Sequence, residues 1–380
     1  MRRSAVGGAA WTMGYGGTSG GGSAAGEPLE SGTYQRAGAV PGEGEGDGYM
    51  TLSLIAAAVS FVLTLLIGRF LIPELRKLKA GQEIREDGPT WHKSKAGTPT
   101  MGGIMFIIGS SVAAVICIAF LWLNGGAETQ LMFVKVVAGA LMAVGFGIVG
   151  FLDDYISIKK HRNLGLTEIQ KLILQFIIVG AYLLSVALAG GTTETVIPFL
   201  GSVDLGFFYY ILAAVFIVGM VNAVNFTDGI DGLNTSVTLV VALVFSVIAM
   251  LLNRVGLSLY AAAIVGAMIG FLFWNANPAK VFMGDTGSLF LGGAVCALAF
   301  GVNMPILLIL IGIIYIVEIL SVVLQVTYFK ISHGKRIFKM APIHHHFEMC
   351  GWNENKICFV FSGVTLLAGI IGVLLAVFGC

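Results

Sequence analysis

The apolar run LMFVKVVAGALMAVGFGIVGFL, residues 131–152, ends directly in two carboxylates, Asp153 and Asp154. A run of about 20 residues crosses the ~30 Å hydrocarbon layer of a bilayer when it is coiled as a helix. A carboxylate placed beside hydrocarbon is costly, so its presence there usually has a functional reason. This stretch therefore predicts a membrane-spanning helix that carries an acidic pair at one membrane face.

Similar runs recur from Thr51 onward and predict an all-α polytopic membrane protein with about ten transmembrane helices. The chain of 380 residues is 57% hydrophobic and only 11% charged, whereas soluble proteins carry about 25% charged residues. The eighth run is short, and its glycines Gly284, Gly287, Gly292 and Gly293 favour close helix packing. The ten runs cover about residues 51–72, 101–123, 131–152, 168–190, 207–224, 232–252, 258–274, 283–300, 305–329 and 357–379.

Residues 1–49 have a different composition, rich in glycine and without an apolar run. Such a segment buries too little apolar surface to order itself. We expect a disordered leader, either added for expression or placed ahead of a natural start at Met50. Residues 50–380 are expected to form a single transmembrane domain.

The basic residues orient the predicted helices. Lys and Arg gather in the loops of one side, at 73–100, 153–167, 275–282 and 330–356, whereas the opposite loops, at 124–130, 191–206, 253–257 and 301–304, hold only Arg254. Loops rich in Lys and Arg stay in the cytoplasm, so both termini are expected outside. The outer segment 192–206 predicts a short β-hairpin. A net charge of +1 gives no overall field to attract nucleic acid.

Five aspartates from distant parts of the chain fall on the predicted cytoplasmic side: Asp153, Asp154, Asp228, Asp231 and Asp285. Grouped carboxylate oxygens are suited to Mg²⁺, and Mg²⁺ in turn indicates phosphate chemistry at the membrane surface. Adjacent acids such as the first two repel one another unless a cation or a proton intervenes. Solvated helix-end acids, neutralised by nearby lysines, are the alternative.

The segment NAVNFTDGIDGLN adds two asparagines, Asn222 and Asn225, to two of these aspartates. Amides at a membrane edge are costly unless they bond to something, so this segment predicts a polar binding site. Helix capping explains one aspartate there but not the whole group. The segment NANPAKVFMGDTGS adds Asn275 and Phe282, and an aromatic ring between a base and an acid suits stacking on a flat ligand, with simple packing as the alternative.

Two further cytoplasmic segments carry candidate residues. In KSKAGTPT, Lys95 can contact an anion, and Thr100 stands beside it at the start of the second span. In APIHHHFE, the residues His344, His345 and His346 favour phosphate contact or proton handling, because histidine titrates near neutral pH. A polar interfacial loop is the alternative. Glu318 lies inside the ninth span without a partner that the sequence reveals.

These segments together resemble the phospho-N-acetylmuramoyl-pentapeptide transferase (MraY) family, within the polyprenyl-phosphate N-acetylhexosamine-1-phosphate transferase superfamily. The resemblance runs from about residue 51 to the end, through KSKAGTPTMGG, GFLDDYISIKK, NAVNFTDGIDGL, NPAKVFMGDTGSL and APIHHHFE. It implies a homodimer in the bacterial inner membrane. It also implies Mg²⁺-dependent transfer from UDP-N-acetylmuramoyl-pentapeptide to undecaprenyl phosphate, which gives lipid I and UMP for peptidoglycan synthesis.

The resemblance also implies roles for the residues. Asp285 would be the main Mg²⁺ ligand, and Asp153 and Asp154 would help to hold the metal and position or deprotonate the lipid phosphate. A covalent intermediate on either of these two acids is the rival mechanism. The nucleoside would contact Asn225, Asp228, Asp231 and Phe282, the last by stacking on uracil. Further positions, with His344 and His345 as catalytic candidates and the others as substrate contacts, are Lys95, Thr100, Asn222, Asn275, His344, His345 and His346.

Two other functions compete with this expectation. A cation-coupled transporter predicts acids near mid-membrane and a repeat between two halves, whereas the acids here lie at one face. A related transferase that uses UDP-N-acetylglucosamine shares most of these segments, and APIHHHFE is the segment that favours the muramoyl-pentapeptide substrate.

Overall fold

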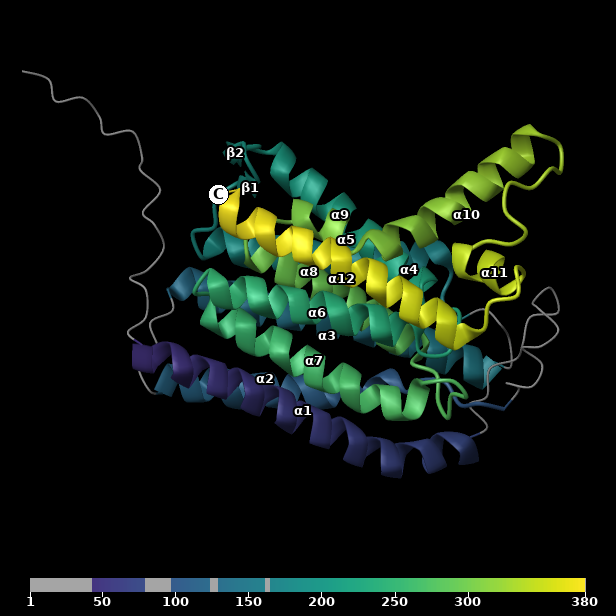
Figure 1. The fold of residues 1–380 in the computed structure, drawn as a ribbon, viewed down its shortest axis with the longest axis horizontal. Coiled ribbons are helices and arrows are strands. Elements are labelled where there is room, and N and C mark those ends of the chain that lie inside the picture. Colours follow the sequence, from purple (N-terminus) through teal and green to yellow (C-terminus); the bar gives the residue numbers. More distant parts are fainter. Residues whose placement is uncertain (1–42, 79–96, 124–128, 161–164, 380) are drawn as a thin grey trace, which may run out of the picture. The chain divides into compact units, whose positions relative to one another are not determined.

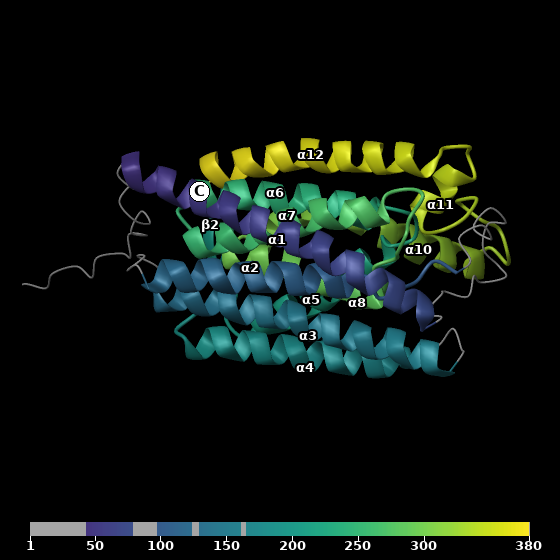
Figure 2. The same ribbon diagram turned by 90° about the horizontal axis from the view of Figure 1, so that it is seen from below.

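A computed structural model gives the fold, and it describes residues 43–78, 97–123, 129–160 and 165–379. Within these residues, ten helices are long and apolar enough to cross a membrane, which confirms the prediction. Figures 1 and 2 show them running side by side. They are α1 (Glu43–Lys77), α2 (Gly103–Leu123), α3 (Gln130–Lys160), α4 (Glu168–Leu188), α5 (Phe208–Phe226), α6 (Leu233–Leu251), α7 (Val255–Asn275), α8 (Gly284–Gly301), α10 (Ile313–Ile331) and α12 (Glu354–Phe378).

Helix α1 begins at Glu43, ahead of residue 50, where the transmembrane domain was expected to begin. The helical part of the chain therefore includes the last residues of the segment 1–49. The rest of the predicted leader, residues 1–42, lies outside the described ranges.

The ninth predicted span is not one helix. It is broken at Gly312 into the short helix α9 (Ile306–Ile311) and the longer α10. Figure 1 shows α10 diverging from α12 toward its own C-terminal end. Helix α10 exposes apolar side chains such as Leu320, Val323 and Leu324. In a membrane-spanning helix, such side chains contact the hydrocarbon of the lipids. A periodic apolar pattern continues through Gly312, so the sequence alone did not reveal the break.

Helix α8 is the most enclosed helix of the bundle, since every residue from Thr286 to Gly301 is buried. Its glycines allow neighbouring backbones to approach. A Cβ atom at Gly292 would lie 2.6 Å from the Val221 Cα of α5, and one at Gly293 would lie 2.8 Å from the Ala143 Cα of α3. Close packing by these glycines is confirmed.

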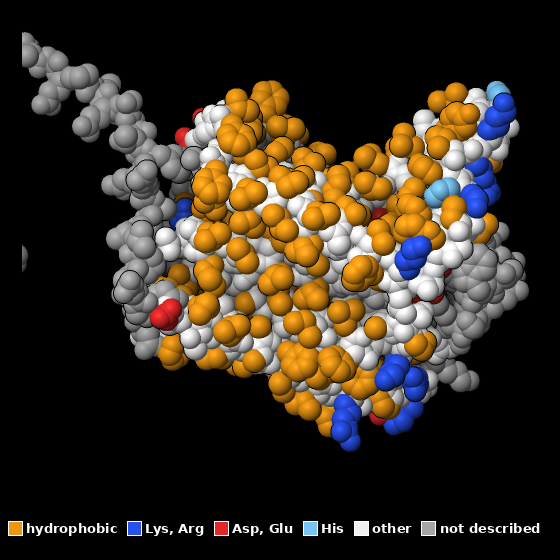
Figure 3. Space-filling view, in the orientation of Figure 1, with side chains coloured by type: hydrophobic (Ala, Val, Ile, Leu, Met, Phe, Trp, Pro, Cys, Tyr) orange, Lys and Arg blue, Asp and Glu red, His pale blue; other side chains and the backbone are white. Residues whose placement is uncertain are grey.

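The predicted hairpin is also confirmed. Strands β1 (Glu194–Ile197) and β2 (Gly201–Asp204) pair antiparallel. The Phe199 N–H donates to the Gly379 carbonyl at 2.6 Å, so the hairpin is attached to the end of α12. At the other end of the bundle lie the C-terminal end of α10 and the short helix α11 (Ile343–Glu348), and most Lys and Arg side chains visible in Figure 3 gather there.

Candidate active site

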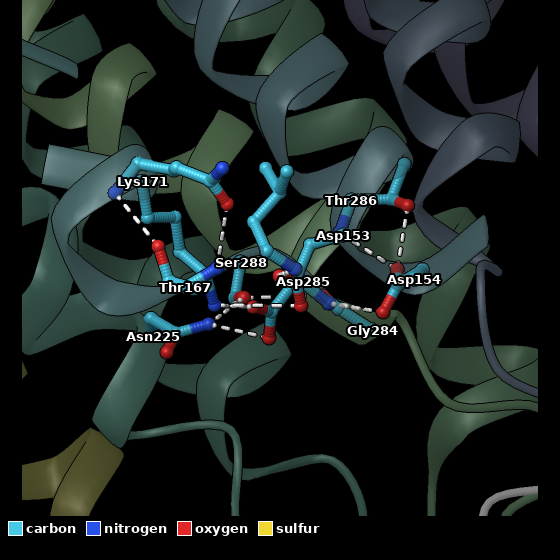
Figure 4. Close-up of polar contacts among 11 residues, drawn as sticks. Asp153, Asp154, Thr167, Lys171, Asn225, Gly284, Asp285, Thr286 and Ser288 are labelled. Carbon is cyan, nitrogen blue, oxygen red and sulfur yellow. Dashed lines mark hydrogen bonds and ion pairs between the residues drawn. The ribbon is translucent and has the colours of Figure 1, made fainter. Parts of the chain in front are cut away.

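Helices α3 and α8 bring Asp154 and Asp285 together, although 130 residues separate them in the chain. Asp154 Oδ1 accepts from the Asp285 N–H at 3.2 Å, and Asp154 Oδ2 accepts from the Thr286 N–H at 2.9 Å and from the Thr286 hydroxyl at 2.6 Å. The first turn of a helix leaves N–H groups without intrahelical partners. Asp154 therefore caps α8 from a neighbouring helix and fixes the position of Asp285 (Figure 4).

A lysine of α4 contacts both Asp285 and Asp153. Lys171 Nζ donates to Asp285 Oδ2 at 2.8 Å and lies 3.4 Å from Asp153 Oδ2. The Leu166 N–H donates to Asp153 Oδ1 at 2.8 Å. A capping box between Thr167 and Gln170 starts α4 at this point, which places Lys171 in its first turns, facing the acids.

Helix α5 supplies the amide side of the site. Asn225 Nδ2 donates to Asp285 Oδ1 at 2.9 Å and to Ser288 Oγ at 2.7 Å. One turn earlier, Asn222 Nδ2 donates to Gln175 Oε1 and to the Val218 carbonyl, each at 2.8 Å. The structure thus places Asn225 in direct contact with the carboxylate group and Asn222 against α4, one helical turn away.

Asp228 lies in the turn between α5 and α6 and is half-buried. Burial raises the pKa of its carboxyl well above the ordinary value, and the negative charges of Asp285, Asp154 and Asp231 raise it further. These carboxylates are therefore close enough to repel one another. The free protein therefore disfavours the ionised form of Asp228. A ligand that is cationic or donates hydrogen bonds would stabilise that form.

Two predicted substrate contacts make bonds within the protein. Asp231 Oδ2 accepts from the Asn277 amide at 3.1 Å and from the Ala279 N–H at 2.9 Å. The Asn275 amide donates to the Val281 carbonyl at 3.1 Å, and its oxygen accepts from the Thr235 hydroxyl at 2.7 Å. Both side chains are buried and hold the segment 275–283 against α6, so the structure gives them a supporting position.

The segment that precedes α2 lies along the segment that precedes α8. The Phe282 N–H donates to the Pro99 carbonyl at 2.8 Å, and the Gly102 N–H donates to the Phe282 carbonyl at 2.8 Å. A Cβ atom at Gly284 would lie 2.5 Å from both the Thr100 hydroxyl and Asp154 Oδ2. The Thr100 hydroxyl therefore lies beside the Asp154 carboxylate, and the Phe282 backbone lies along the same segment, whereas Lys95 lies outside the described residues.

The three consecutive histidines have three different surroundings. His344 is buried, with Nδ1 3.0 Å from Glu318 Oε2. His345 Nδ1 lies 2.6 Å from Glu348 Oε2. His346 Nδ1 accepts from the Lys339 N–H at 3.2 Å. The His344 and His345 rings lie against one another, with their centroids 4.2 Å apart, whereas the His346 ring packs against Phe338 and Phe347.

Known proteins match this chain over most of its length. The model of glycosyl transferase family 4 matches residues 135–303, and a phospho-N-acetylmuramoyl-pentapeptide-transferase signature matches residues 95–107. A phospho-N-acetylmuramoyl-pentapeptide-transferase of Clostridium perfringens is 48% identical over 83% of this chain and 94% of the relative. One of Bacillus mycoides is 44% identical over 85% of this chain and 98% of the relative.

The chain belongs to the phospho-N-acetylmuramoyl-pentapeptide-transferase family. The part of this transferase that the glycosyl transferase model matches includes the acidic pair of α3, the Asp228 turn and Asp285. The signature covers Thr100 and Lys95.

Two carboxylates of the transferase site, Asp285 and Asp153, keep oxygens with which Mg²⁺ could be held. Oxygens of Asp285 and Asp153 converge on the Lys171 ammonium, which shows that a positive charge is accommodated between them. Both oxygens of Asp154 instead accept hydrogen bonds from α8. Across the described ranges, no group of three His, Cys, Asp or Glu residues is already arranged to hold a metal ion, and the set of Asp285, Asp153 and Asp154 stays a prediction. Mg²⁺ needs only one or two carboxylates when phosphates and waters complete its shell.

Sequence reasoning did not select several residues that the structure places in this transferase site. Lys171 lies inside the fourth apolar run, where an ionisable residue is itself a functional signal that was available but unused. Ser288 and Thr286 carry no such signal, because small hydroxyl residues are common in packed transmembrane helices. Their role depends on which neighbouring helix faces them.

Proposed function

We propose that this protein transfers phospho-N-acetylmuramoyl-pentapeptide from its UDP derivative to undecaprenyl phosphate, which gives lipid I and releases UMP. The site supports this reaction because carboxylates and a lysine from three helices meet at one end of a membrane-spanning bundle. A lipid phosphate lies at the headgroup plane, and a soluble nucleotide reaches the same plane from the aqueous side. The contact of Lys171 with both Asp285 and Asp153 is the observation that carries the proposal.

The reaction is a displacement at phosphorus. An oxygen of the lipid phosphate bonds to the phosphorus that carries the sugar, and the bond from that phosphorus to the bridging oxygen of UMP breaks. UMP leaves with the bridging oxygen and its electron pair. Two anions must approach one another, so positioning and charge neutralisation dominate catalysis. Mg²⁺, when bound, supplies positive charge that neutralises the phosphates of the nucleotide.

The residues of the chain divide this work. Asp285 and Asp153 present the oxygens that would hold Mg²⁺, and Asp153 is positioned to accept a proton from the lipid phosphate. Lys171 supplies a fixed cation beside them. Asp154 orients α8, so that Asp285 points toward Lys171 and Asn225.

The nucleotide is assigned to the surface next to these carboxylates. Asn225 and Asp228 lie on its α5 side, and Phe282 and Thr100 border it on the other. An aromatic ring beside polar groups suits a base that stacks and forms hydrogen bonds. The proposal further places the protein in the inner membrane, with this site facing the cytoplasm, and includes a homodimer. The basic residues at the α10 and α11 end of the bundle support the orientation.

The test is release of UMP and formation of a lipid-linked sugar phosphate by the detergent-solubilised protein. Asp285→Asn is expected to lower kcat by at least about 100-fold, the usual effect of removing one electrostatic group at a reacting phosphate. Removal of Mg²⁺ with a chelator is expected to stop turnover. Asp204→Asn, in the hairpin at the opposite end, serves as the matched control. Near-normal turnover by the Asp285 variant, or an equal rate with UDP-N-acetylglucosamine, would contradict the assignment.

A further inference from the structure

Glu318 and His344 form a buried pair that the reaction described above does not use. Glu318 lies on α10 and His344 on α11, and their side chains are 0% and 1% exposed. Glu318 Oε2 and His344 Nδ1 are 3.0 Å apart. No partner for Glu318 could be identified from the sequence, and the structure places one on a different helix.

The pairing determines which ring nitrogen of His344 carries hydrogen. An ionised carboxylate accepts hydrogen bonds only, so with Glu318 ionised the Nδ1–H group of His344 donates to Oε2. In the neutral ring, Nε2 then carries the lone pair, because the bond made by one nitrogen sets the state of the other. An unpaired carboxylate in a transmembrane helix would be costly, which favours retaining this bond.

The far edge of the imidazole lies against the turn that carries Asp228. A Cβ atom at Gly229 would overlap His344 Nε2 and would lie 2.5 Å from its Cε1 atom. Only glycine leaves room for the ring at this point. Nε2 is buried and has no partner within the part of the chain that the structure describes. The ring therefore supports the backbone directly after Asp228 through packing.

A second polar contact joins the segment that precedes α11 to α10. Gln325 Oε1 accepts from the Ile337 N–H at 3.1 Å and the Phe338 N–H at 3.0 Å, and Gln325 Nε2 donates to the Phe338 carbonyl at 3.2 Å. Helix α10 thereby holds the segment that leads into α11 through Gln325 and α11 itself through Glu318. Helix α10 thus determines where the His344 ring meets the Asp228 turn.

We propose that Glu318 is a positioning residue, which holds His344 in one orientation so that the ring supports the Asp228 turn on the nucleotide side of the site. The inference rests on the proposed function, because Asp228 is assigned there to the nucleotide. In this role His344 acts by packing against the turn at Gly229.

The first test compares two variants of nearly equal size. Glu318→Gln keeps an oxygen that accepts from Nδ1, whereas Glu318→Leu removes it. We expect the leucine variant to raise the KM for the UDP-sugar about tenfold, because it leaves a buried hydrogen-bond donor without an acceptor. The glutamine variant is expected to stay within about threefold of wild type, and both are expected to keep the wild-type KM for undecaprenyl phosphate. Glu74→Gln, an exposed acid on α1, is the control.

The second test uses the contact with Gly229 and remains informative if Glu318→Leu does not fold. Gly229→Ala is expected to raise the nucleotide KM in the wild-type background. In His344→Ala, the same substitution meets an open space and is expected to have little further effect. Gly219→Ala on α5, where a Cβ atom would have no neighbour within 4 Å, is the matched control.

The outcomes separate the two proposals. An inactive wild-type protein would refute the proposed function itself. An active wild type refutes the positioning role if Glu318→Leu leaves the nucleotide KM unchanged, or if Glu318→Gln is as impaired as Glu318→Leu, which would indicate that the charge matters and not the hydrogen bond. Equal effects of Gly229→Ala in both backgrounds would also refute it.

Discussion

Replacement of Gly150 by alanine tests whether the approach of α3 to α8 sets the position of Asp285. Gly150 is one turn ahead of the acidic pair. A Cβ atom there would lie 2.6 Å from the Thr286 backbone nitrogen, and it would overlap the Asp285 carbonyl group. Backbone atoms at an enclosed helix cannot rotate away as a flexible side chain can.

The size of the effect follows from this geometry. Ordinary van der Waals contact requires ~3.5 Å, so α8 must move by about 1 Å at Asp285. Overpacking of this kind costs about 1–3 kcal/mol of stability. A displacement of about 1 Å at a reacting group can lower the rate about 100-fold. We therefore expect a folded protein with a kcat reduced by about two orders of magnitude.

The assay is UMP release at saturating substrates, with thermal unfolding in the same detergent. Gly145→Ala on the same helix is the matched control, because its Cβ atom would meet only the Ile178 side chain, at 3.3 Å, and that side chain can adjust. If Gly150→Ala retained wild-type kcat, the close contact of α3 and α8 would not determine catalytic geometry, and the reasoning would be wrong.

Two further predictions concern charge. Lys171→Met removes the cation between Asp285 and Asp153 and is expected to lower kcat at least about 100-fold; a loss of less than tenfold would contradict its role. Asp228→Asn is expected to raise Tm near pH 7 in buffer without nucleotide or metal, although it weakens nucleotide binding. The folded-state pKa of Asp228 is raised, so ionisation of Asp228 destabilises the fold as pH rises above the unfolded pKa of about 3.9. The gain in Tm should vanish below about pH 4, and a lower Tm at pH 7 would contradict the prediction.

The convergence of Asp153 and Asp285 was predictable from sequence, because apolar length and basic loops together place both at one membrane face. The different roles of Asp153 and Asp154 were not predictable from sequence. Asp153 and Asp154 are neighbours with the same chemistry, and only the position of the α8 N-terminus directs one of them to backbone N–H groups. Helix packing, which sequence periodicity does not specify, makes that distinction.

The same limit applies to Glu318. Its intramembrane position marked it as unusual, but its partner comes from a helix 26 residues further on. The break at Gly312 sets the direction of α10, and hence this pairing. Apolar composition continues through the break, so the sequence predicted one span and did not indicate that α10 and α11 share a buried hydrogen bond.

The enclosure of α8 has a consequence for inhibitors. A compound that binds Asp285 contacts a carboxylate on a helix that is packed on every side. The side of the site that α8 forms can therefore change little in shape when an inhibitor binds. Adaptation to different drug shapes must come from the turns at 97–102 and 277–283, which border the carboxylates. Medicinal chemistry aimed at selectivity should therefore vary the groups that face these turns and keep a fixed anchor for the acid.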